Sequence, residues 1–312
     1  MRLSIIIPIC DEQDNILPLY NSLIDVLNQI GESFEIVIVN DGSHDASEEI
    51  LNNLGDKDSH VKVIHLRRNY GQTQAMMAGL AHSSGDIIIA MDGDNQNDPV
   101  DIPRLMAKLD EGYDVVSGWR KERKDSLFYR VIPSKIANWL ISLIGGVKLH
   151  DYGCTLKVYR KEIIKDLRLY GEMHRFIPIY ASWHGASVTE LAVNHRPRLF
   201  GKSKYGFSRV WVVILDLILI KFLDRYMQSP IHLFGGFGLC NFLLAFLTFG
   251  LMLCYKYWWA KTFTETPLPI LIVFFLLVGF MAILMGFVAE MVVRTYYESQ
   301  DKKTYTIKKI IN

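Results

Sequence analysis

Two carboxylates, Asp92 and Asp94, directly follow an apolar run and precede a proline. The run Ile87 to Met91 is continuously apolar, as expected for a strand that is covered on both faces of a parallel sheet. Pro99 permits a helix start, with Asp98 as its N-cap. We therefore expect both acids at the carboxyl end of a central strand, where open α/β sheets bind ligands.

The same acids predict a metal site. Two neighbouring carboxylates repel each other unless a cation or a proton lies between them. Oxygen ligands with a nearby amide suit Mg²⁺ or Mn²⁺, which usually keeps water molecules and completes its shell with substrate phosphates. We assign this site to Asp92, Asp94 and Gln96. An acidic turn that only caps the next helix is the alternative.

The elements that must position these acids alternate between strand and helix. Apolar, β-rich runs predict strands at residues 3–9, 34–39, 61–66 and 87–91. An amphipathic helix with a 3.6-residue period follows the first strand, a second helix is capped by Ser43 to Asp45, and a third covers about 72–82. This alternation predicts an α/β fold with parallel pairing and right-handed crossovers.

Asp41 lies at the end of the second predicted strand, within Asn40-Asp41-Gly42-Ser43. It could accept a hydrogen bond from a nucleobase or a ribose hydroxyl, as an acid does in dinucleotide-binding folds. Asp-Gly-Ser is also a common turn, so a structural role is the alternative. No Walker-type glycine loop and no strict G-x-G-x-x-G follows the first strand, which argues against NTPases and dehydrogenases.

The charge distribution divides the chain of 312 residues. Ile231 to Cys254 and Leu268 to Val293 contain no Lys, Arg or Asp, and each is long enough to cross about 30 Å of hydrocarbon. We predict two transmembrane helices. Basic residues gather before the first and after the second, so both termini should be cytoplasmic. The net charge of +1 gives no argument for a nucleic-acid partner.

Between these parts, Val210 to Phe222 is apolar apart from two charged residues and is too short to span a bilayer. We interpret it as an interfacial helix that presses the catalytic domain onto the lipid. The predicted organisation is a cytoplasmic catalytic domain at 1–208, an amphipathic segment at 209–229 and a membrane domain at 230–312.

Basic residues after a further strand, predicted at Tyr113 to Gly118, are candidates for phosphate binding. Arginine forks match phosphate oxygens, which favours Arg120 and Arg123 for this role. A solvated run of charge is the alternative. Arg175 is a third candidate and lies with His174 in a predicted polar loop. A lone histidine of this kind is more often structural than catalytic.

Four motifs, in order along the chain, resemble those of inverting family 2 glycosyltransferases with a nucleotide-diphospho-sugar-binding fold. They are Ser4 to Pro8, Asn40-Asp41-Gly42-Ser43, Asn69-Tyr70-Gly71-Gln72 and Met91-Asp92-Gly93-Asp94-Asn95-Gln96. The whole chain is similar to the polyprenyl-phosphate branch, which includes dolichol-phosphate mannose synthases and bacterial undecaprenyl-phosphate glycosyltransferases with two carboxy-terminal membrane helices. The resemblance implies a GT-A, Rossmann-like catalytic domain.

The resemblance also implies roles for individual residues. The nucleotide-sugar site would include Pro8, Cys10, Glu12, Asp41, Gly93 and Gln96, with Asp92 and Asp94 at the metal and diphosphate. Cys10 stands where relatives often have an aromatic residue, and Gly93 where they often have Ala. The first departure leaves the base-stacking residue, and so the base, unassigned.

On the acceptor side, Asp151-Tyr152-Gly153-Cys154-Thr155-Leu156-Lys157 is similar to the family's acceptor motif, especially in aminoarabinose-transferring members. It makes Asp151 the candidate for a second functional carboxylate. Ser203 and Lys204 lie in a basic, glycine-containing loop, and the resemblance assigns them to closure over phosphates.

The expected reaction is inverting transfer of a hexose or pentose from a nucleotide-diphospho-sugar to undecaprenyl or dolichyl phosphate at the cytoplasmic membrane face. A phosphomonoester has a second pKa of about 6, so this acceptor is already nucleophilic and needs no strong base. A diacylglycerol acceptor would need one, and Asp151 could serve. A processive polysaccharide synthase is disfavoured because no Gln-x-x-Arg-Trp stretch precedes the spans.

A catalytically silent membrane scaffold or transporter subunit is the remaining alternative. Two spans make a poor pore, and retained acids argue against silence. We also expect a homo-oligomer, although the sequence does not fix the number of subunits. Ala282 and Gly286 are small residues, four apart in the second span, that would let helices approach closely.

Overall fold

The computed structural model describes residues 2–121, 138–139, 141–143, 145–165, 173–197, 230–258 and 262–299. The chain forms two compact units, Met1–Leu217 and Ile218–Asn312. The predicted interfacial segment and the phosphate candidates Arg123, Ser203 and Lys204 lie outside the described residues.

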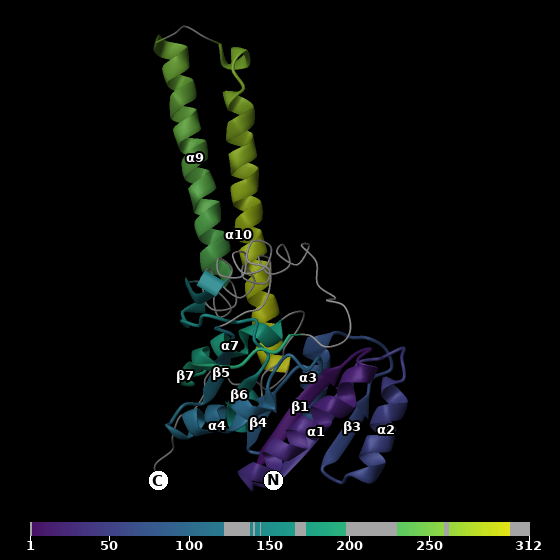
Figure 1. Cartoon of the computed structure of the whole chain (residues 1–312). Helices are drawn as coiled ribbons and strands as arrows, with labels where there is room; N and C mark the ends of the chain where they lie inside the picture. The colour runs from purple at the N-terminus through teal and green to yellow at the C-terminus, as the bar shows by residue number, and fades with distance from the viewer. Residues whose placement is uncertain are drawn as a thin grey trace. The chain divides into compact units, whose positions relative to one another are not determined.

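The first unit is built on one seven-stranded sheet with the order β3-β2-β1-β4-β6-β5-β7 (Figure 1). The strands are β1 Leu3–Ile9, β2 Phe34–Asn40, β3 Val61–His65, β4 Ile87–Ala90, β5 Val115–Trp119, β6 Lys157–Arg160 and β7 Val188–Ala192. Each predicted strand is therefore present. The ends of β1 match the prediction, and those of the other predicted strands differ from it by at most two residues.

The predicted parallel pairing is confirmed for the first four strands, since β1 pairs in parallel with both β2 and β4, and β2 with β3. The second half departs from this pattern. β6 is inserted antiparallel between β4 and β5, and β5 pairs in parallel with β7. Because two reversals restore the direction, β5 runs the same way as β4. The carboxyl ends of β1, β2, β4, β5 and β7 therefore share one edge of the sheet with the start of β6.

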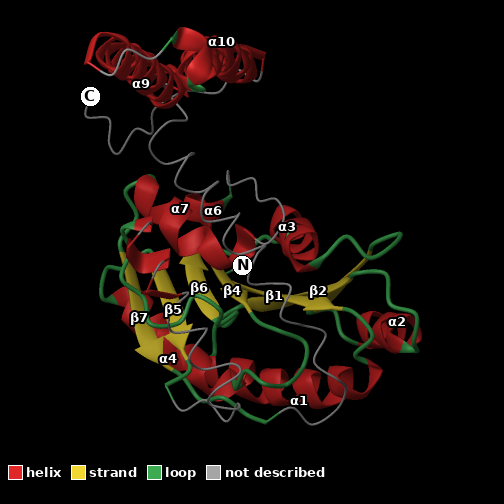
Figure 2. Cartoon of the chain, turned by 90° about the horizontal axis from the view of Figure 1, so that it is seen from above, coloured by secondary structure: helices red, strands yellow, loops and turns green. Residues whose placement is uncertain are grey.

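Helices cover both faces of this sheet. α1 and α4 lie on one face, and α3 and α7 on the other (Figure 2). The helices and turns are α1 Gln13–Ile30, α2 Ser47–Lys57, α3 Gln72–His82, η1 Pro99–Asp101, α4 Ile102–Asp110, α6 Lys161–Ile164, η3 Met173–Phe176 and α7 Ile177–Trp183. The predicted N-cap is confirmed, because the Asp98 side chain accepts from the N–H of Val100 at 3.2 Å.

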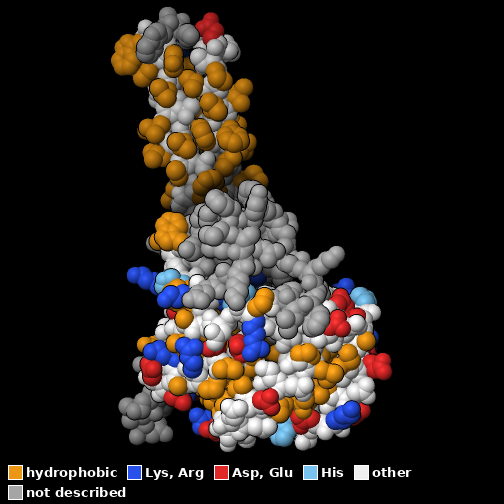
Figure 3. All heavy atoms as spheres, in the orientation of Figure 1, with side chains coloured by type: hydrophobic (Ala, Val, Ile, Leu, Met, Phe, Trp, Pro, Cys, Tyr) orange, Lys and Arg blue, Asp and Glu red, His pale blue; other side chains and the backbone are white. Residues whose placement is uncertain are grey.

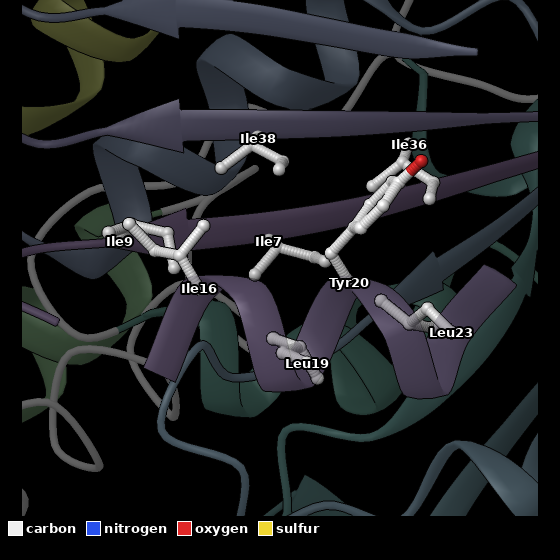
Figure 4. Close-up of a pocket in the computed structure, with 8 residues that line it drawn as sticks. All are labelled: Ile7, Ile9, Ile16, Leu19, Tyr20, Leu23, Ile36 and Ile38. Atoms are coloured by element: carbon white, nitrogen blue, oxygen red, sulfur yellow. The ribbon is translucent and has the colours of Figure 1, made fainter. Parts of the chain in front are cut away.

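The main core lies between the sheet and α1, α2 and α4, where alternate strand residues meet the apolar stripes of the helices. Figure 4 shows a small gap in this core, lined by Ile7, Ile9, Ile16, Leu19, Tyr20, Leu23, Ile36 and Ile38. Its single side-chain polar atom is the Tyr20 hydroxyl, which donates to Asp58 at 2.7 Å. Burial and this carboxylate raise the pKa of Tyr20 to about 12. The gap is part of the core and offers no reactive group.

The second unit contains two long helices, α9 Pro230–Trp258 and α10 Leu268–Ser299, joined through the turn η4 Phe263–Glu265. Both are long and apolar enough to cross a membrane, and large apolar side chains cover their outer faces (Figure 3). This composition suggests membrane anchoring.

Glycine lets these two helices pack closely. A Cβ added to Gly238 would lie 2.7 Å from the carbonyl oxygen of Gly279, so the backbones touch at this crossing. A Cβ at Gly286 would lie 2.8 Å from Ile231 Cδ1. Gly286 therefore serves the pairing of α10 with α9 of the same chain.

Candidate active site

The shared edge of the sheet collects the predicted site residues that follow or precede its strands. They come from five separate segments of the sequence, and all of them lie in the first unit: Cys10 and Glu12, Asp41, Asp92 and Asp94, Arg120, and Asp151. This arrangement agrees with the rule that α/β sheets bind ligands beyond the carboxyl ends of their strands.

Two side chains from distant parts of the sequence hold the Asp92 carboxylate. Gln72, at the start of α3, donates from Nε2 to Oδ1 at 2.6 Å, and Thr155, just before β6, donates from Oγ1 to Oδ2 at 2.7 Å. The N–H of Asp92 donates to Asn97 Oδ1 at 3.1 Å. Each carboxylate oxygen keeps a further lone pair for a ligand.

The rest of the acidic loop is a tight turn fixed to α1. Asn95 adopts a left-handed backbone, with φ 60°, which a short polar side chain tolerates. Its Nδ2 donates to both the backbone oxygen and Oδ1 of Asn15, each at 3.0 Å. Asp94 is 9% exposed, and its Oδ1 accepts from the N–H of Gln96 at 3.1 Å. The acidic loop is therefore held by hydrogen bonds within itself and to α1.

Local packing leaves no room for a side chain at Gly93, the position where the resemblance leads us to expect alanine. A Cβ at this position would lie 2.2 Å from Ile9 Cδ1 and 3.2 Å from the carbonyl oxygen of Pro8. Ile9 thus fills the volume that an alanine methyl group would need.

Pro8 is placed where β1 and β4 separate. The pairing of β1 with β4 ends at Ile6 and Ala90, whereas its pairing with β2 continues to Ile9. A proline has no N–H to give to a neighbouring strand. It is tolerated at position 8 because this residue lies beyond the last pair between β1 and β4. The acidic loop begins at this point of divergence.

The other predicted nucleoside residues support neighbouring loops. Both oxygens of Asp41, which is 3% exposed, accept backbone N–H groups, from Tyr70 at 2.7 Å and from Gly71 at 2.9 Å. Glu12 accepts from Asn15 Nδ2 at 2.6 Å and so reaches the acidic loop indirectly. Cys10 Sγ lies 3.1 Å from Asn69 Nδ2. Asp41 therefore fixes the loop that carries Gln72.

Arg120 and Asp151 form a two-pronged ion pair beside these acids. Nε lies 2.7 Å from Oδ2 and Nη2 lies 3.0 Å from Oδ1, while the N–H of Gly153 donates to Oδ1 at 3.1 Å. Burial alone would lower the pKa of Arg120, but the Asp151 carboxylate outweighs it and raises that pKa. The guanidinium is therefore permanently charged, and two hydrogen bonds hold it against Asp151.

Lys157 lies buried behind this pair, at the start of β6. Its Nζ donates to the carbonyl oxygens of Tyr152, at 3.3 Å, and of Cys154. Burial lowers the pKa of Lys157 to about 8, against the opposing effects of the Cys154 thiol and Asp151. Burial also raises the pKa of Cys154 to about 11, so this thiol is inert at neutral pH. Lys157 therefore organises the loop from residue 151 to residue 155.

The segment after β7 is tied to the acidic loop. His195 forms a β-bridge with Asn97, and the N–H of Arg196 donates to the Gln96 carbonyl at 2.9 Å. The Arg196 guanidinium pairs with both oxygens of Asp98, at 2.9 and 2.7 Å. The chain that leads towards the predicted phosphate loop is thus fixed beside the acids.

The polar-loop prediction is wrong for the described residues of that segment. His174 lies in η3 and is only 6% exposed, with Nδ1 2.7 Å from Thr73 Oγ1. Burial and this contact agree with its interpretation as a structural histidine, which stays a prediction. Arg175 follows it in the same turn and is partly buried.

The donor set at the acidic loop fits a hard divalent cation. Among the residues with described positions, no three His, Cys, Asp or Glu side chains gather closely enough to hold a metal by themselves. Mg²⁺ and Mn²⁺ at nucleotide sites usually take one or two protein carboxylates, together with water and substrate phosphates. Asp92 and Asp94 would supply these two protein carboxylates.

Sequence reasoning missed Gln72 and Thr155, although both stand inside the motifs that carried the resemblance. Neither is charged, and their importance comes from hydrogen bonds to Asp92 across 20 and 63 positions of sequence. Asn15 and Asn95 were missed for the same reason, since amide pairing between loops has no periodic pattern.

Comparison with known proteins agrees with this geometry. Residues 4–168 match Glycosyl transferase family 2. The chain is 40% identical to dodecaprenyl-phosphate galacturonate synthase of Rhizobium johnstonii, over 100% of this chain and 94% of that protein. It is 37% identical to undecaprenyl-phosphate 4-deoxy-4-formamido-L-arabinose transferase of Salmonella paratyphi B, over 99% and 94%.

Solved structures share the fold of the first unit. Glucosyl-3-phosphoglycerate synthase from Mycobacterium tuberculosis, in complex with Mn²⁺, uridine-diphosphate and phosphoglyceric acid, aligns with a TM-score of 0.55 at 16% identity, covering 72% of this chain and 78% of that one. The family match, the two relatives that align over nearly their whole length and this GT-A likeness together show that the chain is a glycosyltransferase and belongs to glycosyl transferase family 2.

Proposed function

We propose that this protein transfers a sugar from a nucleotide-diphospho-sugar to a polyprenyl phosphate at a membrane surface, with inversion at the anomeric carbon. The observation that carries the proposal is the similarity to two polyprenyl-phosphate sugar transferases, which extends over both the acid-bearing domain and the two apolar helices.

On the donor side, Asp92 and Asp94 would hold Mg²⁺ or Mn²⁺, with Gln96 beside them, and Asp41 would help to shape the nucleoside site. The cation would neutralise charge on the departing nucleoside diphosphate. Gln72 and Thr155 each donate to one oxygen of the Asp92 carboxylate, so this negative charge is held at the place where the cation would bind.

On the acceptor side, Arg120 would bind the phosphate of the lipid. Asp151 accepts hydrogen bonds from Nε and Nη2 of the Arg120 guanidinium. This pairing leaves the Nη1 edge of Arg120 for an oxygen of the acceptor phosphate. Asp151 is 3% exposed and already accepts from Arg120 and Gly153. It therefore suits the orientation of Arg120 better than the activation of a hydroxyl, which favours a phosphate acceptor over diacylglycerol.

A single displacement accounts for the chemistry. The acceptor phosphate is largely dianionic at neutral pH and attacks without a general base. What the protein contributes is alignment of the two substrates and electrostatic stabilisation at one sheet edge. Arg123, Arg175, Ser203 and Lys204 remain proposed phosphate contacts, and we place the active site and both termini in the cytoplasm, with a homo-oligomeric assembly.

Radiolabel transfer tests this function. The purified full-length protein would be given a panel of nucleotide sugars with undecaprenyl phosphate, and diacylglycerol would serve as the control acceptor. We expect an acid-labile lipid product with undecaprenyl phosphate and none with diacylglycerol. Transfer to diacylglycerol, or no transfer from any donor, would contradict the proposal.

A further inference from the structure

Two segments of the chain meet at the Asp92 carboxylate, and the proposed function assigns one to the donor and the other to the acceptor. Gln72 approaches one oxygen at 2.6 Å and Thr155 the other at 2.7 Å. Hydrogen bonds to a carboxylate are charge-assisted and roughly twice as strong as neutral ones. Asp92 is therefore a junction as well as a candidate metal ligand.

The donor side of this junction is the segment from Asn69 to Gln72, which leads into α3. Asp41 holds its backbone through the N–H groups of Tyr70 and Gly71. Gln72 follows directly and reaches Asp92. The proposed nucleoside site and the metal acid thus share one short, doubly anchored segment.

The acceptor side is the loop from Asp151 to Thr155. Asp151 orients Arg120 at one end, and Thr155 reaches Asp92 at the other. Between them, Gly153 donates to Asp151, and the buried Lys157 holds the carbonyls of Tyr152 and Cys154. Hydrogen bonds hold the four residues before Thr155 to the ion pair or to Lys157, so this short loop connects Arg120 to Asp92.

We infer that Thr155 is a positioning residue that couples occupancy of the metal and diphosphate site to the orientation of the Arg120–Asp151 clamp. A cation at Asp92 fixes the plane of the carboxylate, and the Thr155 hydroxyl carries that orientation into the loop that holds Arg120. The donor complex thereby prepares the acceptor site.

This inference rests on the proposed function, and thermodynamic linkage gives it a measurable consequence. If donor and acceptor sites are coupled, each ligand must tighten the other by the same factor, typically fivefold or more. The factor should depend on a hydroxyl at position 155, since a methyl group cannot donate to Asp92. Thr155→Ser keeps that donor, whereas Thr155→Val removes it at nearly the same volume.

The test measures Mn²⁺ binding by the loss of the free-ion electron paramagnetic resonance signal, with the full-length protein in detergent. Titrations would contain UDP together with either undecaprenyl phosphate or undecaprenol, which lacks the phosphate. Wild type, Thr155→Val and Thr155→Ser would be compared with Thr189→Val, which makes the same chemical change on β7.

We expect undecaprenyl phosphate, but not undecaprenol, to tighten Mn²⁺ and UDP binding about fivefold in wild type, Thr155→Ser and Thr189→Val. Thr155→Val should still bind each ligand, but the ratio should fall below about twofold. An unchanged ratio in Thr155→Val, or no coupling in wild type, would overturn the inference. Failure of the wild type to transfer sugar to any polyprenyl phosphate would instead overturn the proposed function.

Discussion

The Arg120 guanidinium and the Asp151 carboxylate face each other in a parallel, two-bond arrangement, with Nε 2.7 Å from Oδ2 and Nη2 3.0 Å from Oδ1. Arg120 follows β5 and Asp151 precedes β6, so the pair lies at the same edge of the sheet as the acidic loop. In the proposed function, this relationship makes an acidic residue part of the phosphate-binding site.

Removing the charge of Asp151 should therefore affect both stability and acceptor binding. Asp151→Asn leaves the buried guanidinium without its counter-charge, which should cost about 3 kcal/mol of unfolding free energy. It should also raise KM for undecaprenyl phosphate about tenfold while changing KM for the nucleotide sugar little. Chemical unfolding and steady-state kinetics measure the two effects. If Asp151 were a general base, kcat would fall by orders of magnitude with an unchanged acceptor KM.

Lys157 should make stability depend on alkaline pH. Its pKa is about 8 in the folded protein against an ordinary value of 10.5, so the unfolded chain binds more protons between these values. Its contribution to the unfolding free energy should therefore rise with pH across this window, by up to about 3 kcal/mol. Below pH 8 the burial penalty is fully present.

Lys157→Met isolates this effect, because the Cys154 thiol, whose pKa is about 11, titrates in both proteins. The difference in Tm between wild type and Lys157→Met should shift in favour of wild type as pH rises from 8 to 10. A difference that stays constant across that range would show that Lys157 is not charged and buried as described.

Gly93 gives a prediction with a built-in rescue. Gly93→Ala should place its methyl group against Ile9 Cδ1, where a Cβ would lie only 2.2 Å away. Such overpacking typically costs about 1–3 kcal/mol. Ile9→Val removes that atom, so the double variant should recover most of the stability lost by Gly93→Ala. Strictly additive losses in thermal unfolding would show that Ile9 is not the obstacle.

The sequence was most informative where its pattern is regular. The apolar period of α1 and the runs that became β1 to β4 follow from burial on one or two faces, and the position of Asp92 after β4 follows from them. β6 was not predicted because it spans only Lys157–Arg160 and contains two basic residues in four. Its position between β4 and β5 depends on tertiary packing, which the local sequence pattern does not predict.

The contacts inside the site were harder to predict for a different reason. Thr155 and Gln72 gain their roles from hydrogen bonds that join segments far apart in sequence, and a neutral polar residue in a loop predicts no partner. The polar residues Glu172 and Arg175 near His174 predict a polar loop, yet Nδ1 of this histidine lies 2.7 Å from Thr73 Oγ1 in a buried turn. Burial of a polar group becomes predictable only when its partner is known.

The most direct test of the central claim is the initial rate of sugar transfer from the active nucleotide donor to undecaprenyl phosphate, with and without Mn²⁺, for wild type and Asp92→Asn. Asn keeps the shape of the side chain and an oxygen for Gln72 or Thr155, but it removes the charge that would bind the cation. We predict metal-dependent transfer by wild type and a loss of at least about a hundredfold in Asp92→Asn, with Tm within a few degrees of wild type. Equal rates in the two proteins, or transfer that is independent of a divalent cation, would contradict the account.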